Sequence, residues 1–403
     1  MDPYSLWPIL GAFLLAWLLC LVTGANGAPM DPGRRSSLDG LRGYLAFCVF
    51  LHHASFYVEF SHSGAWIEPA SRVYAHLGDS SVKLFFMITG FLFYSKLLRA
   101  QAEPGRDFDW MGLFAGRFCR IVPMYWLAIS VMFVIVAFVT GFQLREPAYR
   151  LLAKAANWLV FFFTTQPDLN GVKATRLIFS GVIWTLVVEW MFYLFLPILG
   201  LLLGVKVSRP ILALALIPCA WLAAYVGFRT LPTLVAIVPF IGGVLAAHVN
   251  RSPRWTRLLR GPAAGAVAIA AFGLDVALTP NGHNFITPIF LAIGFIPIAC
   301  GNSLFGLLDL KAARFLGEIS FSIYILHGIV LYVTFCMVLP RFGIEGLSPP
   351  AHWAVVLGLV PVVMGLSTLT FRNVEDKWLR AAPRLAQALR RTAMLRQGRV
   401  VTP

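Results

Sequence analysis

The chain has 403 residues, of which 59% are hydrophobic and only 13% are charged. So few polar residues exclude an ordinary soluble protein of this size and predict an all-α, polytopic helical membrane protein. The net charge of +15 is compatible with nucleic acid or an anionic surface. The basic residues, however, follow the ends of apolar segments, so we interpret them as signals of membrane orientation and expect membrane lipids, not nucleic acid, as partners. The six cysteines show no CxxC spacing, so neither a disulfide framework nor a metal site is expected.

The first apolar run covers residues 5–23. Asp2 is the only charge before it, whereas Arg34 and Arg35 follow it. This bias predicts an anchor helix with its N-terminus outside. The small residues after the run leave cleavage of a signal peptide open. We therefore divide the chain into an anchor helix with a basic linker, a membrane domain and a basic tail, at residues 1–36, 37–374 and 375–403.

The apolar segments of the membrane domain predict ten core spans. Their expected positions are about 43–60, 82–98, 121–142, 177–203, 211–228, 231–249, 262–278, 285–308, 319–339 and 352–371. The apolar stretch 158–165 is too short to cross and is expected to be re-entrant or interfacial. Nearly all loops rich in Lys and Arg fall on the side of Arg42, which predicts that this side and the C-terminus are cytoplasmic. The tail is either a helix on the anionic inner surface or a solvated segment.

Arg42 lies at the start of the first core span, and His53 lies well inside it. Eleven helical steps make about 1100°, which is within about 20° of three turns, so both side chains share one face. They are about 16 Å apart along the axis, roughly half of a hydrocarbon core. His52 points about 80° away from Arg42, which makes His53 the candidate for chemistry. The alternative is that Arg42 only orients the helix and that His53 is a hydrogen-bonded packing residue.

Glu189 lies about twelve residues into another span. A carboxylate at that depth normally faces a polar cavity or a partner, and Tyr193 shares its face one turn later. The alternative is an ion pair that only holds helices together.

At the inner edge of a third span, Arg117 and Arg120 are adjacent on one helix face and could hold a phosphate. Arginines that only set membrane orientation have the same pattern.

His327 lies inside the ninth expected span, with Tyr324 one turn before it. Both are possible supporting residues, and a packing histidine is the alternative. The pair Thr89 and Gly90 suits a close helix contact and is interpreted as packing.

Together, arginines at the cytoplasmic side and a deeper histidine and glutamate suit coenzyme A as a donor: its phosphates stay at the surface and its thioester reaches inward. His53 then serves as a general base or accepts the acyl group itself.

Five motifs occur in the order found in acyltransferase family 3, the integral-membrane O-acyltransferases of bacterial surface glycans. They are LDGLRG with Arg-x10-His, SVKLFFMITGF, RFCRIVPMYW, WTLVVEWMFY and LGEISFSIYILH, and the resemblance covers about residues 37–374. It implies ten core helices in the bacterial inner membrane. It also implies transfer of an acyl group, usually acetyl from cytoplasmic acetyl-CoA, to a glycan hydroxyl, with no permanently bound cofactor.

The resemblance also assigns roles by position. It implies that His53 is the catalytic histidine, that Arg42 is its motif partner, and that Glu189 is the family's intramembrane glutamate. Arg117 and Arg120 would contact the donor.

The sequence departs from the family at three positions. Lys83 stands where an acidic residue is common, Thr89 where a serine is common, and Trp190 where a second acid is common. Because Lys83 is expected at the outer end of its helix, this departure concerns the acceptor more than the donor. The acceptor glycan, the acyl group, the oligomeric state and the need for a partner protein stay open.

Two other functions are compatible with charged residues inside membrane spans. One is a glycan or lipid transporter, which would predict inverted repeats that the sequence does not show. The other is a non-catalytic subunit of a polysaccharide assembly complex, against which the intact Arg42, His53 and Glu189 argue.

Overall fold

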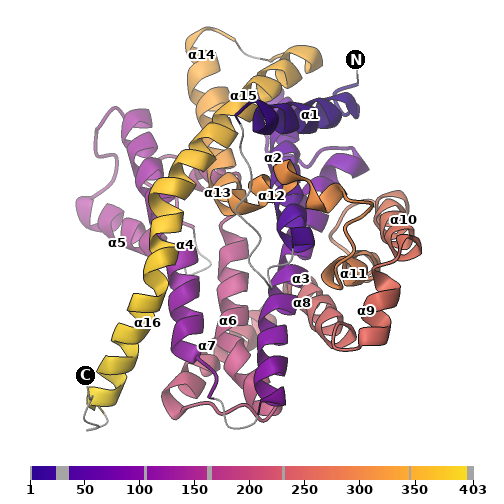
Figure 1. The fold of residues 1–403 in the computed structure, drawn as a ribbon. Coiled ribbons are helices and arrows are strands. Elements are labelled where there is room, and N and C mark those ends of the chain that lie inside the picture. The colour runs from indigo at the N-terminus through magenta and orange to yellow at the C-terminus, as the bar shows by residue number, and fades with distance from the viewer. Residues whose placement is uncertain are drawn as a thin grey trace. The chain divides into compact units, whose positions relative to one another are not determined.

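The structure is a computed structural model that describes residues 2–23, 36–103, 107–160, 166–228, 232–344 and 346–396. Within these ranges every regular element is a helix, and the only β contact is an isolated bridge between Leu169 and Val172. The predicted all-α class is therefore confirmed for the described part of the chain (Figure 1).

The α-helices are α1 (Trp7–Val22), α2 (Ser36–Ser63), α3 (Arg72–Ala102), α4 (Trp110–Val139), α5 (Ala148–Leu159), α6 (Trp184–Leu202), α7 (Arg209–Phe228), α8 (Pro232–Val249), α9 (Pro253–Leu259), α10 (Pro262–Leu278), α11 (Thr287–Ala299), α12 (Lys311–Glu318), α13 (Ser320–Tyr332), α14 (Leu339–Arg341), α15 (Pro349–Thr370) and α16 (Asp376–Arg396). Two short 3-10 helices are η1 (Thr175–Phe179) and η2 (Leu307–Asp309). Two π-helical segments are η3 (Val333–Val338) and η4 (Phe371–Glu375).

The chain forms two compact units, which we describe separately. Unit 1 comprises Met1–Lys96, Leu177–Glu189 and Ala220–Ser367, and unit 2 comprises Leu97–Arg176, Trp190–Cys219 and Thr368–Pro403. The boundaries fall inside helices α3, α6, α7 and α15 and inside the 3-10 helix η1.

Five helical segments of the described chain are long and apolar enough to cross a membrane: α3, α4, α6, α13 to α14, and α15 continuing into α16. A sixth span is possible if α9 and α10, which meet at a bend of 70°, count as one. Although α2 has 28 residues, it is not among the five because its polar and charged side chains lower its hydropathy. The helices support a membrane protein, but the count of ten spans is not confirmed.

Several helices begin or end away from their expected limits. The Asp109 side chain caps α4 by accepting a hydrogen bond from the Gly112 backbone N–H at 2.9 Å, so α4 begins at Trp110 rather than near residue 121. Helix α3 begins at Arg72, which places Lys83 well inside it with only 6% of its surface exposed. The expected position of Lys83 at a helix end is therefore wrong. Helix α11 ends at Ala299, well before residue 308.

Other expectations concern residues outside the described ranges. Residues 24–35, where the anchor would be cleaved, are not described, so cleavage is untested; α1 itself is a helix, as expected. Of the stretch 158–165, Trp158 and Leu159 end helix α5 and residues 161–165 are not described. Its re-entrant or interfacial position stays a prediction.

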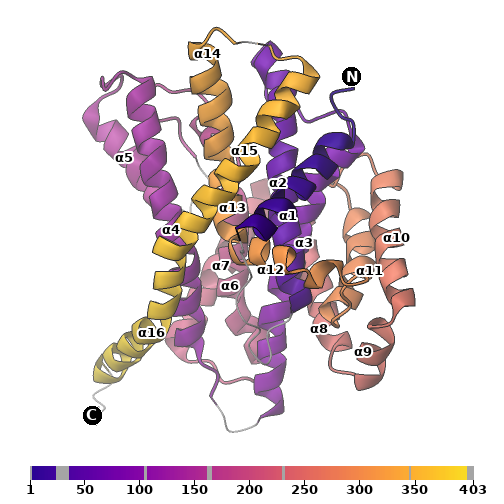
Figure 2. The same ribbon diagram turned by 45° about the horizontal axis from the view of Figure 1, so that its top comes forward.

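In unit 1, α2 is packed between other helices at glycine contacts. Helix α12 lies across the N-terminal half of α2 (Figures 1 and 2), where a Cβ on Gly43 would lie 2.6 Å from the Ala313 carbonyl oxygen. A Cβ on Gly317 would come closer still to the Asp39 carbonyl oxygen. On α3, a Cβ on Gly90 would lie 2.6 Å from the Phe240 carbonyl oxygen, so this part of the Thr89–Gly90 pair does serve close helix packing.

In unit 2, helix α16 runs along α4, as both ribbon views show (Figures 1 and 2). An ion pair between Arg390 and Asp109 joins the two helices near the start of α4. Residues 376–396 of the basic tail are therefore helical and packed against the membrane domain's own helix. Contact of this helix with a lipid surface stays a prediction.

Candidate active site

The Arg42 and His53 side chains belong to one continuous helix, α2, as the sequence predicts. Because the helix has no break between them, the two residues share a face, and both are half-buried. The neighbouring His52 is buried, and its Nδ1 lies 2.7 Å from the Tyr74 carbonyl oxygen. Gly78 is packed directly against the His52 ring. His52 is therefore a packing residue, and His53 remains the candidate for chemistry.

His53 meets His327, which comes from α13 and is fully buried. The His327 Nε2 lies 3.0 Å from the His53 Nδ1, and the two rings are stacked with centroids 5.0 Å apart. Each histidine also faces the carbonyl oxygen of the preceding turn of its own helix. The His53 Nδ1 is 3.0 Å from the Val49 oxygen, and the His327 Nδ1 is 3.0 Å from the Ile323 oxygen. Two residues that the sequence singled out separately thus form one pair.

Unit 1 contains further polar side chains on the helix of His327 and on the helices beside it. The Tyr324 hydroxyl, one turn before His327, lies 2.8 Å from the Thr185 hydroxyl on α6. Thr185 and Glu189 are four residues apart and share a face of α6. Thr89 on α3 donates a long hydrogen bond of 3.4 Å to the Glu189 carboxylate. We call these residues the histidine–glutamate network, whose members are His53, His327, Tyr324, Thr185, Glu189 and Thr89.

Two members of this network were not recognised as site residues in the sequence. The sequence pattern at Thr89 indicates helix packing, and no motif indicates a role for Thr185. The signal for Thr185 was its position one helical turn before Glu189. The neighbour of Thr89 comes from another helix, so no local pattern could have indicated it.

The predicted arginine pair belongs to unit 2, and its two members have different partners. Arg120 Nη1 lies 2.5 Å from the Glu375 Oε1, and the Glu375 side chain is fully buried. The Arg117 guanidinium lies over the ring of the buried Tyr193, 5.8 Å from its centroid. Arg120 thus already has a carboxylate partner, and the contact of the two arginines with the donor stays a prediction. Tyr193, a possible supporting residue from the sequence, has the Arg117 guanidinium over its ring.

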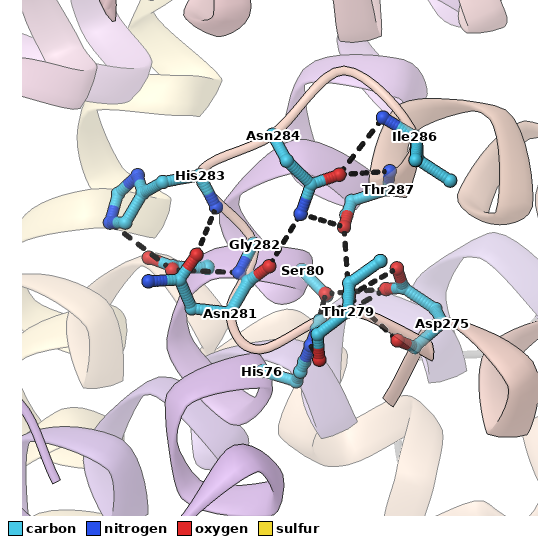
Figure 3. Close-up of polar contacts among 11 residues, drawn as sticks. His76, Ser80, Asp275, Thr279, Asn281, Gly282, His283, Asn284, Ile286 and Thr287 are labelled. Carbon is cyan, nitrogen blue, oxygen red and sulfur yellow. Dashed lines mark hydrogen bonds and ion pairs between the residues drawn. The ribbon is translucent and has the colours of Figure 1, made fainter. Parts of the chain in front are cut away.

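A second buried polar cluster surrounds Asp275 in unit 1 (Figure 3). Asp275 is 1% exposed, accepts a hydrogen bond of 3.0 Å from the Ser80 hydroxyl, and has the His76 Nδ1 at 3.3 Å. The His76 Nε2 lies 3.0 Å from the Thr279 hydroxyl. Because these groups satisfy one another, the cluster joins α3 to α10 and has a structural role. Asp275 also interacts electrostatically with the buried Lys83.

Close to this cluster, three exposed or half-exposed side chains have the spacing of metal ligands. One ligand atom each from Glu68, Asp79 and His283 lies within 4.8 Å of the others. Asp79 accepts a hydrogen bond from the Gly282 backbone N–H and pairs with His283 at 3.2 Å. These contacts connect α3 to the loop before α11.

Comparison with known proteins decides the family. A family model described as an acyltransferase domain, that of acyltransferase family 3, matches residues 35–372. The chain belongs to the acyltransferase 3 family. The resemblance drawn from its motifs is thereby confirmed, and so is the prediction that it is an acyltransferase.

Three relatives are similar at low identity. The peptidoglycan O-acetyltransferase OatA of Listeria monocytogenes is 24% identical over 84% of this chain and 55% of its own length. Nodulation protein 10 of Rhizobium leguminosarum is 28% identical over 41% of this chain and 44% of its own length. The exopolysaccharide production protein ExoZ of Rhizobium meliloti is 26% identical over 64% of this chain and 78% of its own length. The chain thus spans about half the length of the first two, and no solved structure matches it.

Proposed function

We propose that this acyltransferase carries an acetyl group from cytoplasmic acetyl-CoA to a hydroxyl of a cell-surface or exported glycan, with His53 as the general base. The observation that supports this best is the pattern of hydrogen bonds at the His53 ring. Its Nδ1 is held by the Val49 carbonyl and His327, whereas its Nε2 has no hydrogen-bond partner within the described residues. An imidazole fixed at one nitrogen and open at the other is suited to take a proton from a substrate.

The proposed reaction balances as a simple transfer. The acceptor O–H gives its proton to the His53 Nε2 while its oxygen forms a bond to the thioester carbonyl carbon. Collapse of the tetrahedral intermediate breaks the C–S bond, and the departing sulfur takes the proton from the His53 Nε2–H. The products are the acetyl ester and free coenzyme A, and His53 returns to its neutral form.

The other site residues have proposed roles in this scheme. Arg42, half-buried near the start of α2, and Arg117 are candidates to contact the donor phosphates, since a guanidinium forms forked hydrogen bonds with them. We propose that Arg120 keeps α4 and η4 in place through its ion pair with Glu375. Glu189 is proposed to accept a hydrogen bond from the acceptor, with Thr89 holding its carboxylate.

The names of relatives support the glycan acceptor, and the distribution of basic residues supports the membrane orientation. The names of two relatives refer to peptidoglycan and to exopolysaccharide, both polymers of the cell surface. We place the protein in the bacterial inner membrane with a cytoplasmic C-terminus. The distribution of basic residues supports this orientation, because cytoplasmic loops are enriched in Lys and Arg.

The test scores ester-linked acyl groups on surface polysaccharide, released by base and identified by mass. Cells carrying the wild-type chain are compared with cells carrying His53→Ala at matched protein levels. The control is His352→Gln, because His352 is another buried histidine of unit 1 whose Nε2 bonds to the Ala54 carbonyl at 3.1 Å. We expect loss of the ester only in His53→Ala. An equal ester content in the wild type and His53→Ala would contradict the proposal.

A further inference from the structure

We propose that His327 is a positioning residue that fixes the proton of His53 on Nδ1 and so keeps the His53 Nε2 free as the base. This inference rests on the proposed role of His53. It concerns a residue 274 positions away in the chain, which contributes no atom to the reacting groups.

The first step of the argument is the state of His327 itself. Its Nδ1 lies 3.0 Å from the Ile323 carbonyl oxygen, which can only accept a hydrogen bond. The proton of the neutral His327 ring is therefore on Nδ1. Its Nε2 carries a lone pair and acts only as an acceptor. Because His327 is fully buried, a charged form without a counter-ion would be costly there.

The second step follows for His53. Its Nδ1 faces two acceptors at 3.0 Å, the Val49 carbonyl oxygen and the His327 Nε2. Only a protonated Nδ1 can satisfy both, by a shared hydrogen bond. A neutral ring has one proton, so the His53 Nε2 is left with its lone pair. With an acceptor on each side of the Nδ1–H, the ring is also held against rotation.

The third step concerns the charge that develops during the reaction. When the His53 Nε2 takes a proton, the positive ring donates a stronger hydrogen bond from Nδ1 to the His327 Nε2. Many enzymes place a carboxylate at this position to orient the base and stabilise its charge. A neutral histidine orients the base without adding a permanent charge inside a membrane, where such a charge is expensive.

The neighbouring titratable groups do not offer an alternative for this role. The His52 ring is 4.8 Å from the His53 ring and meets it at its edge, while its own Nδ1 faces the Tyr74 carbonyl. Tyr324, on the same helix as His327, has its hydroxyl on Thr185. Only His327 contacts the His53 Nδ1 among side chains of the described residues.

Three substitutions separate positioning from packing. A glutamine amide oxygen can occupy the place of a histidine Nε2, so His327→Gln keeps an acceptor for the His53 Nδ1–H. An asparagine amide reaches only the place of Nδ1, so His327→Asn keeps the bond to Ile323 but not the bond to His53. His327→Leu keeps neither. Asparagine is the matched polar control, because it has the same amide as glutamine but is one methylene shorter.

Activity is measured as release of free coenzyme A thiol from acetyl-CoA by purified protein in nanodiscs, with polysaccharide from the producing cells as the acceptor. We expect kcat to stay within about threefold of the wild type in His327→Gln and to fall about 10- to 100-fold in His327→Asn and His327→Leu, the range seen when the group that orients a metal-binding histidine is lost. KM for acetyl-CoA should be unchanged. Equal rates in the Gln and Asn variants, or an active Leu variant, would overturn the proposal.

A second readout does not depend on activity. Nitrogen-15 NMR of the histidine side chains, with His53 assigned by its loss in His53→Ala, reports which ring nitrogen is protonated. We expect Nδ1–H in the wild type and in His327→Gln, and a mixture in His327→Asn. Protonation of Nε2 in the wild type would overturn the inference. If the wild-type protein releases no thiol but His53 is protonated on Nδ1, the proposed function fails and the positioning contact stands.

Discussion

In unit 1, His53 is held by the Val49 carbonyl and the His327 ring, neither of which carries a permanent charge, whereas in unit 2 Arg120 is held by an ion pair with a buried carboxylate. The two arrangements solve different problems. A neutral partner leaves the reactive nitrogen of His53 available, because no opposite charge holds a proton on it. The ion pair neutralises Arg120 and fastens two helical segments, so its removal should affect stability before chemistry.

The largest effect on stability is expected in unit 2. Glu375→Gln leaves the Arg120 charge without its partner in a mostly buried position, which costs about 3–5 kcal/mol in comparable buried pairs. The neighbouring Asp376→Asn is the control, because Asp376 pairs with Arg380 on an exposed surface and such pairs contribute about 0–1 kcal/mol. Unfolding in detergent by denaturant compares the two. Equal stability of both variants would show that the ion pair does not hold α4.

A smaller effect is expected in unit 1 from Thr185→Val. The Thr185 hydroxyl donates to the Val182 carbonyl at 2.8 Å, so the Tyr324 hydroxyl must be the donor in their mutual bond. Valine leaves this buried hydroxyl unpaired, at a cost of about 1–3 kcal/mol in unfolding free energy. Thr185→Ser should recover most of it. A valine variant as stable as the serine variant would remove Thr185 from the network.

A third effect should appear mainly in the rate of transfer. Thr89→Val removes the long hydrogen bond to Glu189 but keeps the shape of the side chain. We expect kcat to fall about two- to fivefold, which corresponds to about 0.5–1 kcal/mol, and Thr89→Ser to restore it. The measurement is thiol release from acetyl-CoA in nanodiscs. A fall of the same size in Thr89→Ser would indicate lost packing rather than a lost hydrogen bond.

The smallest effect concerns an ion pair at the periphery of unit 2. The hydrogen bond from Lys154, followed by that from the Asn170 backbone, lowers the pKa of Glu146. Glu146 therefore contributes its full stabilisation at pH values above the ordinary pKa of a carboxyl group. This contribution is lost as pH falls through the lowered pKa of Glu146. Glu146→Gln should cost about 0.5 kcal/mol at pH 7 and nothing near pH 2. A cost that is independent of pH would contradict an electrostatic origin.

Local periodicity was enough to predict the relation between Arg42 and His53, because both lie on one unbroken helix. The contact of His53 with His327 could not be predicted in the same way, since it depends on how α13 packs against α2. The motif around each histidine only indicated that both were unusual in an apolar segment.

The contacts that the sequence does not predict are those between segments far apart in the chain. The partner of Arg120, Glu375, lies in a segment that the sequence indicates as the start of the tail. Lys83 was expected at a helix end because hydropathy does not reveal that α3 begins at Arg72. In both cases the local pattern was compatible with two structures, and tertiary packing decided between them.

The most direct test of His53 as a general base follows the acetyl group itself. Purified protein in nanodiscs is incubated with acetyl-CoA labelled in the acetyl group and with polysaccharide from the producing cells, using the wild type and His53→Gln. We predict base-labile label on the polysaccharide with the wild type and at least about 100-fold less label with His53→Gln. No label should be retained on the protein. Label bound to the wild-type protein and absent from His53→Gln would identify His53 as an acyl carrier instead. Equal transfer by both proteins would contradict any catalytic role of His53.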